Sequence, residues 1–349
     1  METPAGGNSR EKDQRSALRV VFMGTPEFAV GALESVHGAF TVVAVYTQPD
    51  KPVGRGLEMR ATPVKACAQR LGLTVYQPEK LTQPGTFEQL TELRPDVIVV
   101  VAYGQILKTN VLRLPRLGCV NIHSSLLPRW RGAAPIQWAI LEGDAETGVT
   151  TMHLVEKLDA GDILLQERTP ISATDTAQTV HDRLASLGAE LILPTLRGLD
   201  DGTLIGKKQD EAGINYASKL TKEMEPIDPS LGAAVLDRRI RALNPWPGTS
   251  VMVRPSLDGS GNGGGAETEA APWTRLKIKR AVPHAGLSVP EGRIIERNGM
   301  VCLGTRAGSL ELQVLQWEGK KEVDAAGFLN GWRSQASKAM TLEVGSQSK

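Results

Sequence analysis

The sequence has little of several features that mark whole classes of protein. Its three cysteines lie far apart and form no Cys-x-x-Cys pair, so neither a disulfide framework nor a cysteine zinc site is expected. The longest aliphatic run, residues 97–102, is far shorter than the about 20 residues that span a bilayer. Residues 1–17 have no apolar core and include acidic side chains, which argues against a signal or transit peptide. We therefore expect a cytoplasmic protein without a membrane partner.

A strong net charge is also absent. The 40 Lys and Arg nearly balance the 39 Asp and Glu, and a net charge of +1 argues against a surface that binds nucleic acid everywhere. The charge is unevenly divided, because residues 219–349 hold 18 basic against 14 acidic side chains and residues 1–218 hold 22 against 25. The net charge therefore does not exclude a local basic face in the C-terminal part.

Apolar runs alternate with helical patterns up to about residue 200. Strands are expected at 18–23, 40–46 and 96–102, the last apolar nearly throughout, as in a strand covered on both faces. A helix at 179–193 should close this region, because Pro194 is placed to end it. The alternation predicts an α/β fold with an open, parallel-rich, Rossmann-like sheet.

The pattern changes after about residue 200. A helix at 230–243 must stop at Asn244-Pro245-Trp246-Pro247-Gly248, since proline cannot continue it. Short strands separated by glycine follow, which is typical of a small antiparallel β-barrel of OB-like type. The expected organisation is a disordered tail at 1–17, a catalytic domain at 18–206, a linker at 207–228, and a barrel domain at 229–345 with a flexible glycine-rich insertion at 255–272.

Polar residues at two strand ends carry the candidate chemistry. Asn121 and His123 are two residues apart and so share one strand face, and Asp159 lies in a glycine turn between strands. Together they supply an amide donor for an oxyanion, a group that titrates near neutrality and a carboxylate to orient it. No GxSxG motif is present, so direct transfer to a nucleophile fits better than a covalent acyl-enzyme. Spacing alone leaves purely structural roles open.

Nucleotide and metal sites find no support in the motifs. The turn after the first strand lacks the glycines of GxGxxG, and Gly206-Lys207 lacks the rest of a phosphate-binding loop. The other histidines show no metal-ligand spacing. We therefore expect no metal and no nicotinamide or nucleoside triphosphate cofactor.

Longer motifs then follow one another along the chain. They are 22–28 (FMGTPEF), 47–56 (TQPDKPVGRG), 100–104 (VVAYG), 121–136 (NIHSSLLPRWRGAAPI), 158–162 (LDAGD) and 241–248 (RALNPWPG). In these motifs, from about residue 18 into the C-terminal region, the chain resembles the methionyl-tRNA formyltransferases, a group of folate-dependent formyltransferases. One small departure is Ser124, where the family more often has glycine or alanine.

The resemblance implies a reaction and its residues. The formyl group of 10-formyltetrahydrofolate would pass directly to the α-amine of methionine on initiator tRNA, with no metal, for the initiation of translation. Asn121 and His123 would stabilise the tetrahedral oxyanion, and Asp159 would hold His123 and help to take the proton from the amine. The residues implied in folate binding are Ser125, Leu126, Leu127 and Pro128, with Ala102, Tyr103 and Gly104.

Two further segments are implied in tRNA binding. One is the basic loop that holds Lys51 and Arg55, for which the composition alone favours an ordinary solvated loop. The other is a strand in which alternation places Arg275, Lys277 and Lys279 on one face, although a solvated face fits the charge equally well. The resemblance favours initiator methionyl-tRNA and the folate as the partners of a monomeric enzyme.

Several rivals share the catalytic half. Glycinamide ribonucleotide formyltransferase lacks the barrel, and formyltetrahydrofolate deformylase carries a different N-terminal domain. Formyltetrahydrofolate dehydrogenase and bifunctional nucleotide-sugar formyltransferases need a dehydrogenase domain, for which no residues remain. A non-catalytic RNA-binding protein with the same fold is a rival of another class, and intact Asn121, His123 and Asp159 argue against it.

The first prediction concerns Asn121→Ala. Loss of one oxyanion donor should lower turnover by about 10²–10³-fold while leaving the fold and tRNA affinity nearly intact. Single-turnover formylation measures the effect, and a near-normal rate would contradict the role of Asn121.

The second prediction concerns Arg55→Ala. If the loop contacts only tRNA, the variant should lose catalysis on tRNA and keep folate binding. Kinetics with charged tRNA and direct folate titration test this division, which an equal loss of folate affinity would refute.

Overall fold

The computed structural model describes residues 16–53, 58–256, 272–284, 286–335 and 341–345. Backbone contacts divide the chain into two compact units. The N-terminal unit comprises the described parts of Met1–Arg131, Gly148–Arg168 and His181–Asn215, and the C-terminal unit those of Gly132–Thr147, Thr169–Val180 and Tyr216–Lys349. The predicted division at residues 206 and 228 stays a prediction.

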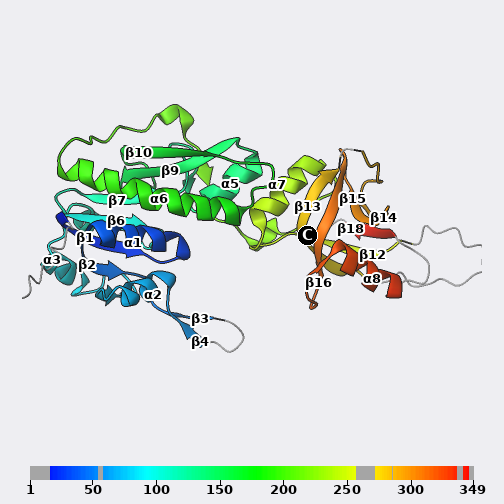
Figure 1. The fold of residues 1–349 in the computed structure, drawn as a ribbon, viewed down its shortest axis with the longest axis horizontal. Coiled ribbons are helices and arrows are strands. Elements are labelled where there is room, and N and C mark those ends of the chain that lie inside the picture. The colour runs from blue at the N-terminus through cyan, green and yellow to red at the C-terminus, as the bar shows by residue number, and fades with distance from the viewer. Residues whose placement is uncertain (1–15, 54–57, 257–271, 285, 336–340, 346–349) are drawn as a thin grey trace, which may run out of the picture. The chain divides into compact units, whose positions relative to one another are not determined.

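A seven-stranded sheet forms the framework of the N-terminal unit (Figure 1). Its strands, in spatial order, are β10 (Ile163–Pro170), β9 (Glu146–His153), β7 (Cys119–His123), β6 (Val97–Val101), β1 (Ser16–Gly24), β2 (Phe40–Tyr46) and β5 (Val75–Tyr76). The pairs β1–β2, β1–β6, β2–β5 and β6–β7 are parallel, whereas β9 runs antiparallel to β7. The expected open, parallel-rich sheet is confirmed.

Helices cover both faces of this sheet. On one face, Leu90 of α3 (Thr86–Glu92) and Val111 of α4 (Thr109–Leu112) pack with Val21 and Ile98. On the other face α6 (Ala177–Asp200) approaches so closely that a Cβ on Gly188 would meet Ile122 of β7 at 2.8 Å. The remaining elements are η1 (Glu27–Ala29), α1 (Val30–Ala39), α2 (Pro63–Arg70) and the hairpin β3 (Lys51–Val53) with β4 (Glu58–Arg60).

Pro194 does not end α6, which corrects the sequence-based expectation. The helix continues to Asp200 with the proline inside it. The side-chain hydroxyl of Thr195 donates a hydrogen bond to the Leu191 carbonyl at 2.7 Å, and Ile192 and Leu196 are fully buried. Burial of this apolar face offsets the backbone hydrogen bond that proline removes.

The C-terminal unit is built on a closed antiparallel barrel (Figure 1). Its strands are β12 (Ser250–Pro255), β13 (Thr274–His284), β14 (Arg293–Arg297), β15 (Met300–Gly304), β16 (Ser309–Trp317) and β18 (Thr341–Gly345). The long strand β13 pairs with both β12 and β16 and so closes the ring. Alternate side chains point inward, including Leu276 and Ile278, which are fully buried. The expected small barrel is confirmed.

Helices and short elements complete the C-terminal unit. Helix α7 (Ala233–Leu243) ends where the Asn-Pro-Trp-Pro segment begins, as expected. Helix α8 (Ala325–Gln335) and strand β18 were not anticipated, and α8 packs Phe328 against Trp317 of the barrel. The other elements are α5 (Pro135–Glu142), β8 (Arg131–Gly132), η2 (Glu211–Gly213), β11 (Tyr216–Ala217), η3 (Lys222–Met224) and β17 (Val323–Asp324). No helix in the described residues is long and apolar enough to cross a membrane.

Candidate active site

Asn121 and His123 lie at the carboxyl end of β7, on the same face of the strand. All five residues of β7 are buried, and the intervening Ile122 points to the opposite face, toward α6. The parallel neighbours β6 and β1 end at the same edge of the sheet. This edge is where open α/β sheets place their ligands, so the fold brings both polar side chains to the edge at which a ligand is expected.

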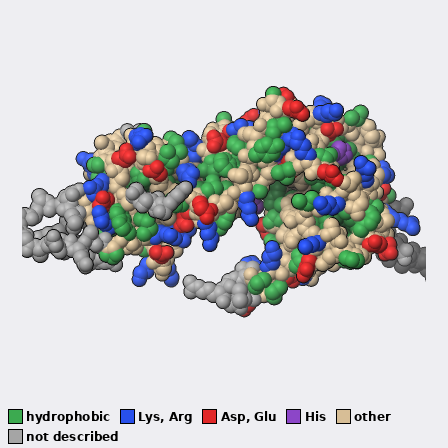
Figure 2. All heavy atoms as spheres, turned by 180° about the vertical axis from the view of Figure 1, so that it is seen from behind, with side chains coloured by type: hydrophobic (Ala, Val, Ile, Leu, Met, Phe, Trp, Pro, Cys, Tyr) green, Lys and Arg blue, Asp and Glu red, His purple; other side chains and the backbone are tan. Residues whose placement is uncertain are grey.

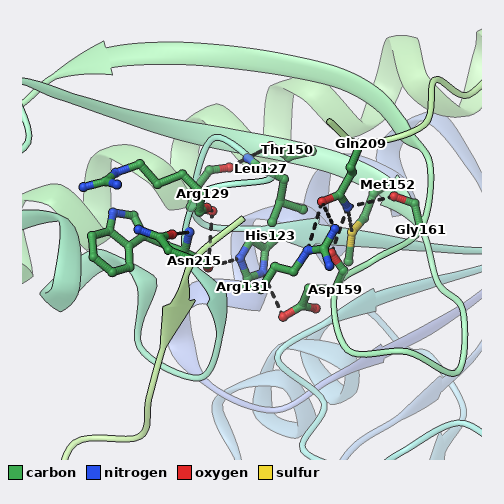
Figure 3. A network of polar contacts seen from close by, with 12 residues as sticks. His123, Leu127, Arg129, Arg131, Thr150, Met152, Asp159, Gly161, Gln209 and Asn215 are labelled. Atoms are coloured by element: carbon green, nitrogen blue, oxygen red, sulfur yellow. Dashed lines mark hydrogen bonds and ion pairs between the residues drawn. The ribbon is translucent and has the colours of Figure 1, made fainter. Parts of the chain in front are cut away.

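His123 has a protein group opposite each ring nitrogen (Figure 3). Its Nε2 lies 2.9 Å from the carbonyl oxygen of Trp130. Because a carbonyl oxygen only accepts, Nε2 carries a hydrogen in this contact. Its Nδ1 lies 3.9 Å from Oδ2 of Asp159, too far for a direct hydrogen bond. Nδ1 is therefore the nitrogen available to exchange a proton.

The Asn121 carboxamide is a polar group of the site that makes no hydrogen bond to the described residues. The residue is 9% exposed, and its side chain has no hydrogen-bond partner within the described part of the chain. Its amide atoms are not among the fully enclosed side-chain atoms that lack a partner in the described residues, so they stay accessible to a ligand. The arrangement therefore leaves an amide donor for a ligand oxygen, next to an imidazole and a carboxylate.

Asp159 reaches His123 from a tightly constrained turn between β9 and β10. Its φ is +47°, an uncommon conformation for a residue other than glycine. Close by, a Cβ on Gly161 would lie 1.7 Å from the His153 carbonyl oxygen, so only glycine fits there. Nε2 of Gln209 donates to the carbonyl oxygens of Asp159 and Gly161, both at 2.8 Å.

The loop after β7 is held by side chains that the sequence analysis did not identify. The Thr150 hydroxyl donates to the Ser125 carbonyl at 2.7 Å and accepts from the Leu127 amide at 3.1 Å. Gln166 donates to the Leu127 carbonyl at 2.9 Å. Ser125 and Leu127 are buried, whereas Leu126 and Pro128 are partly exposed. Residues 125–128 therefore form a fixed loop beside His123.

In the 102–104 segment the Tyr103 ring lies in the core, and it is the backbone that makes the polar contacts. Tyr103 is 2% exposed in the core, where burial raises the pKa of its phenol. Its carbonyl oxygen accepts hydrogen bonds from Thr25 at 2.9 Å and Gln48 at 3.2 Å. Ala102 and Gly104, with φ of +46° and +87°, bend the chain on either side. A role in folate binding for these residues stays a prediction.

The basic residues implied in tRNA binding lie in separate places in the chain. Lys51 is exposed and lines a cavity of about 850 Å³ with Thr25, Gln48 and Arg60. Arg55 lies outside the described residues. On β13, Leu276 and Ile278 point inward, so the expected alternation places Arg275, Lys277 and Lys279 on the outer face.

Charge alone does not mark these basic residues as a nucleic-acid-binding surface. Arg275 is 3.8 Å from Glu318 and is therefore partly neutralised. On the face drawn in Figure 2, Lys and Arg side chains are interspersed with Asp and Glu. Among the described residues, no group of three or more His, Cys, Asp or Glu could hold a metal ion. The tRNA contacts stay a prediction.

Comparisons with known families agree with the motifs. Residues 18–196 match the family described as "Formyl transferase", and residues 219–333 match "Formyl transferase, C-terminal domain". Three curated relatives are each named "Methionyl-tRNA formyltransferase". The Marinobacter nauticus protein is 53% identical over 90% of this chain and 96% of its own length. The Halorhodospira halophila protein is 45% identical over 91% and 97%, and that of Citrifermentans bemidjiense 43% over 92% and 95%.

Solved structures share the fold at low sequence identity. The N-formyltransferase of Helicobacter canadensis, solved with folinic acid and dTDP-3-aminofucose, has a TM-score of 0.61 at 18% identity, over 85% of this chain and 99% of its own. HypX of Aquifex aeolicus in complex with tetrahydrofolic acid has a TM-score of 0.58 at 17% identity, over 91% of this chain. The chain spans 48% of that HypX chain, so this likeness covers about half of the larger protein.

His153, at the end of β9, gives a prediction about stability. Burial lowers the pKa of its imidazole, and the Asp162 carboxylate opposes the shift. The unfolded chain, with a histidine pKa of about 6.5, then binds the proton more readily than the folded chain. Stability should therefore be full above about pH 6.5 and fall as the pH drops toward the lower folded pKa.

Urea denaturation from pH 8 to pH 5 measures this loss. The wild type should lose stability more steeply below about pH 6.5 than His153→Gln, which has no such group. Parallel curves for the two proteins would show that His153 does not contribute.

Proposed function

Because the chain belongs to the methionyl-tRNA formyltransferase family, we propose that it transfers the formyl group of 10-formyltetrahydrofolate to methionine on initiator tRNA. The relatives match at 43–53% identity over nearly their whole length, so both the catalytic half and the barrel are shared. The observation that carries the proposal is the unpaired Asn121 carboxamide beside His123, whose Nδ1 faces Asp159.

The reaction begins with attack of the methionine α-amine on the formyl carbon. A carbon–nitrogen bond forms, and the formyl oxygen takes on negative charge, to which the Asn121 amide donates. Asp159, directly or through a water, takes the proton that the attacking nitrogen gives up. The bond between the formyl carbon and the folate nitrogen then breaks. Asp159 passes the proton it received to Nδ1 of His123, which gives a proton to the departing folate nitrogen while Nε2 stays bound to the Trp130 carbonyl. Both products thus end neutral at the reacting nitrogens, and Asp159 and His123 regain their starting protonation.

The folate is assigned to the fixed loop beside these groups. Ser125, Leu126, Leu127 and Pro128 would hold it, and the bend at 102–104 would line the same pocket through its backbone. The support is that Thr150 and Gln166 hold this loop in place before any ligand arrives, so little ordering cost remains on binding.

The tRNA is assigned to two basic segments. Lys51 and Arg55 of the loop at 51–60 would contact its acceptor end, and Arg275, Lys277 and Lys279 of β13 its backbone. The outward orientation of the three β13 side chains supports the second assignment. Phosphate contacts of this kind make binding salt-dependent. That the enzyme acts as a monomer in the cytoplasm rests on the sequence alone.

One assay tests the function. Purified protein, 10-formyltetrahydrofolate and charged initiator or elongator methionyl-tRNA are incubated, and formyl-methionine and tetrahydrofolate are both quantified. We expect formyl-methionine on initiator tRNA, matched mole for mole by tetrahydrofolate. Tetrahydrofolate released without formyl-methionine would instead identify a deformylase, and absence of both products would contradict the proposal.

A further inference from the structure

We propose that Gln209, acting with Arg131, is a positioning residue that fixes the Asp159 carboxylate beside His123. The inference rests on the proposed function, because it assigns a role in that reaction. Gln209 lies in the segment 207–228, for which the sequence predicts only a linker. In the structure this residue joins the two segments that supply the partners of His123 (Figure 3).

Every hydrogen-bonding group of the Gln209 carboxamide is used within the protein. Its Oε1 accepts from Nε and Nη2 of Arg131 at 3.1 and 2.7 Å. Its Nε2 donates to the carbonyl oxygens of Asp159 and Gly161. Two acceptor positions and two N–H groups are the full capacity of an amide, so none is left for a substrate. Gln209 therefore acts through the residues it holds.

Backbone pairing brings Gln209 to this place. Lys207 and Ile163 exchange two backbone hydrogen bonds of 2.8 Å, which attach the segment to the start of β10. Gln209 is partly buried, whereas its neighbours Lys208 and Asp210 are exposed. The side chain is thus directed inward from a surface segment, toward the turn that carries Asp159.

Arg131 is a buried charge whose position needs an explanation. It is 3% exposed, and among the described residues no carboxylate lies within ion-pair distance of its guanidinium. Its Nη1 is buried without a hydrogen-bond partner in the described residues. Buried charges without a close partner destabilise a fold, and apolar residues of similar volume commonly serve stability better. Stability alone therefore does not account for Arg131, whereas a role in positioning does.

The contacts close a ring around His123. Nε2 of His123 meets the carbonyl of Trp130, and the next residue, Arg131, binds Gln209. Gln209 holds the backbone of Asp159, whose carboxylate faces Nδ1 of the same imidazole. A shift at any member changes the distance between Nδ1 and the carboxylate. The two hydrogen bonds from Gln209 also flank Ala160 and so hold Asp159 at its left-handed φ of +47°.

Two substitutions separate the contact of Gln209 with Arg131 from its contact with the Asp159 turn. Gln209→Glu keeps an acceptor for Arg131 but has no N–H groups for the Asp159 turn, and Gln209→Ala removes both. We expect each to lower kcat by about 10–100-fold with little change in KM for either substrate, since displacement by about 1 Å costs this much. An unchanged kcat in both variants, with an active wild type, would overturn the inference.

A double-mutant cycle tests whether Gln209 acts through Asp159. If it does, Gln209→Ala should have little further effect on single-turnover formylation once Asp159 is Asn. The same fold loss in both backgrounds would refute the connection. Thr195→Val is the matched control, because it removes a buried hydroxyl pair with Thr151 at 2.9 Å on the opposite face of the sheet. Its kcat should stay within about twofold of the wild type.

Hydrogen exchange supplies a readout that does not depend on activity. The amides of residues 157–163 should exchange faster in Gln209→Ala than in the wild type, and at the wild-type rate in Thr195→Val. Unchanged exchange there would overturn the positioning role even if the enzyme proved active. If the wild type is inactive but exchange is faster in Gln209→Ala, the proposed function is wrong and the positioning of the Asp159 turn by Gln209 still holds.

Discussion

The position of His123 between a carbonyl and a carboxylate is the constraint on which the site depends. The Trp130 carbonyl lies 2.9 Å from one ring nitrogen, and this leaves Nδ1, which faces Asp159, as the nitrogen to which the proposed mechanism assigns proton transfer. With Nε2 occupied by the carbonyl, only Nδ1 of this imidazole is open to another group. The loop after β7 and the turn after β9 both reach this ring, and the segment after α6 contacts each of them through Gln209.

The sheet makes that convergence possible. Strands β1, β6 and β7 are parallel, so their carboxyl ends meet at one edge, and β9 returns antiparallel beside β7. Asp159 therefore arrives from the turn after β9 at the same edge as His123. Close packing supports the arrangement from behind, because Gly188 of α6 leaves no room for a Cβ against Ile122. Asn121 and His123 are thereby held on the face that is turned away from α6.

Much of the fold followed from local pattern. The all-apolar strand at 97–101 and the alternation at 275–279 were both predicted, because burial on two faces and on one face leave distinct patterns. Pro194 was misjudged, since a local rule for proline takes no account of the burial of Ile192 and Leu196. Helix α8 was missed, although Phe328 and Trp332 are separated by one helical turn.

The sequence by itself determined the family and named Asn121, His123 and Asp159, because chemically distinctive residues occur there in contiguous motifs. Only the tertiary structure decided how they are held. Gln209 lies 50 residues from Asp159 and 78 from Arg131, in a polar segment with no periodicity. Its role depends on hydrogen bonds between segments far apart in the chain, and a local pattern of residues carries no trace of such contacts.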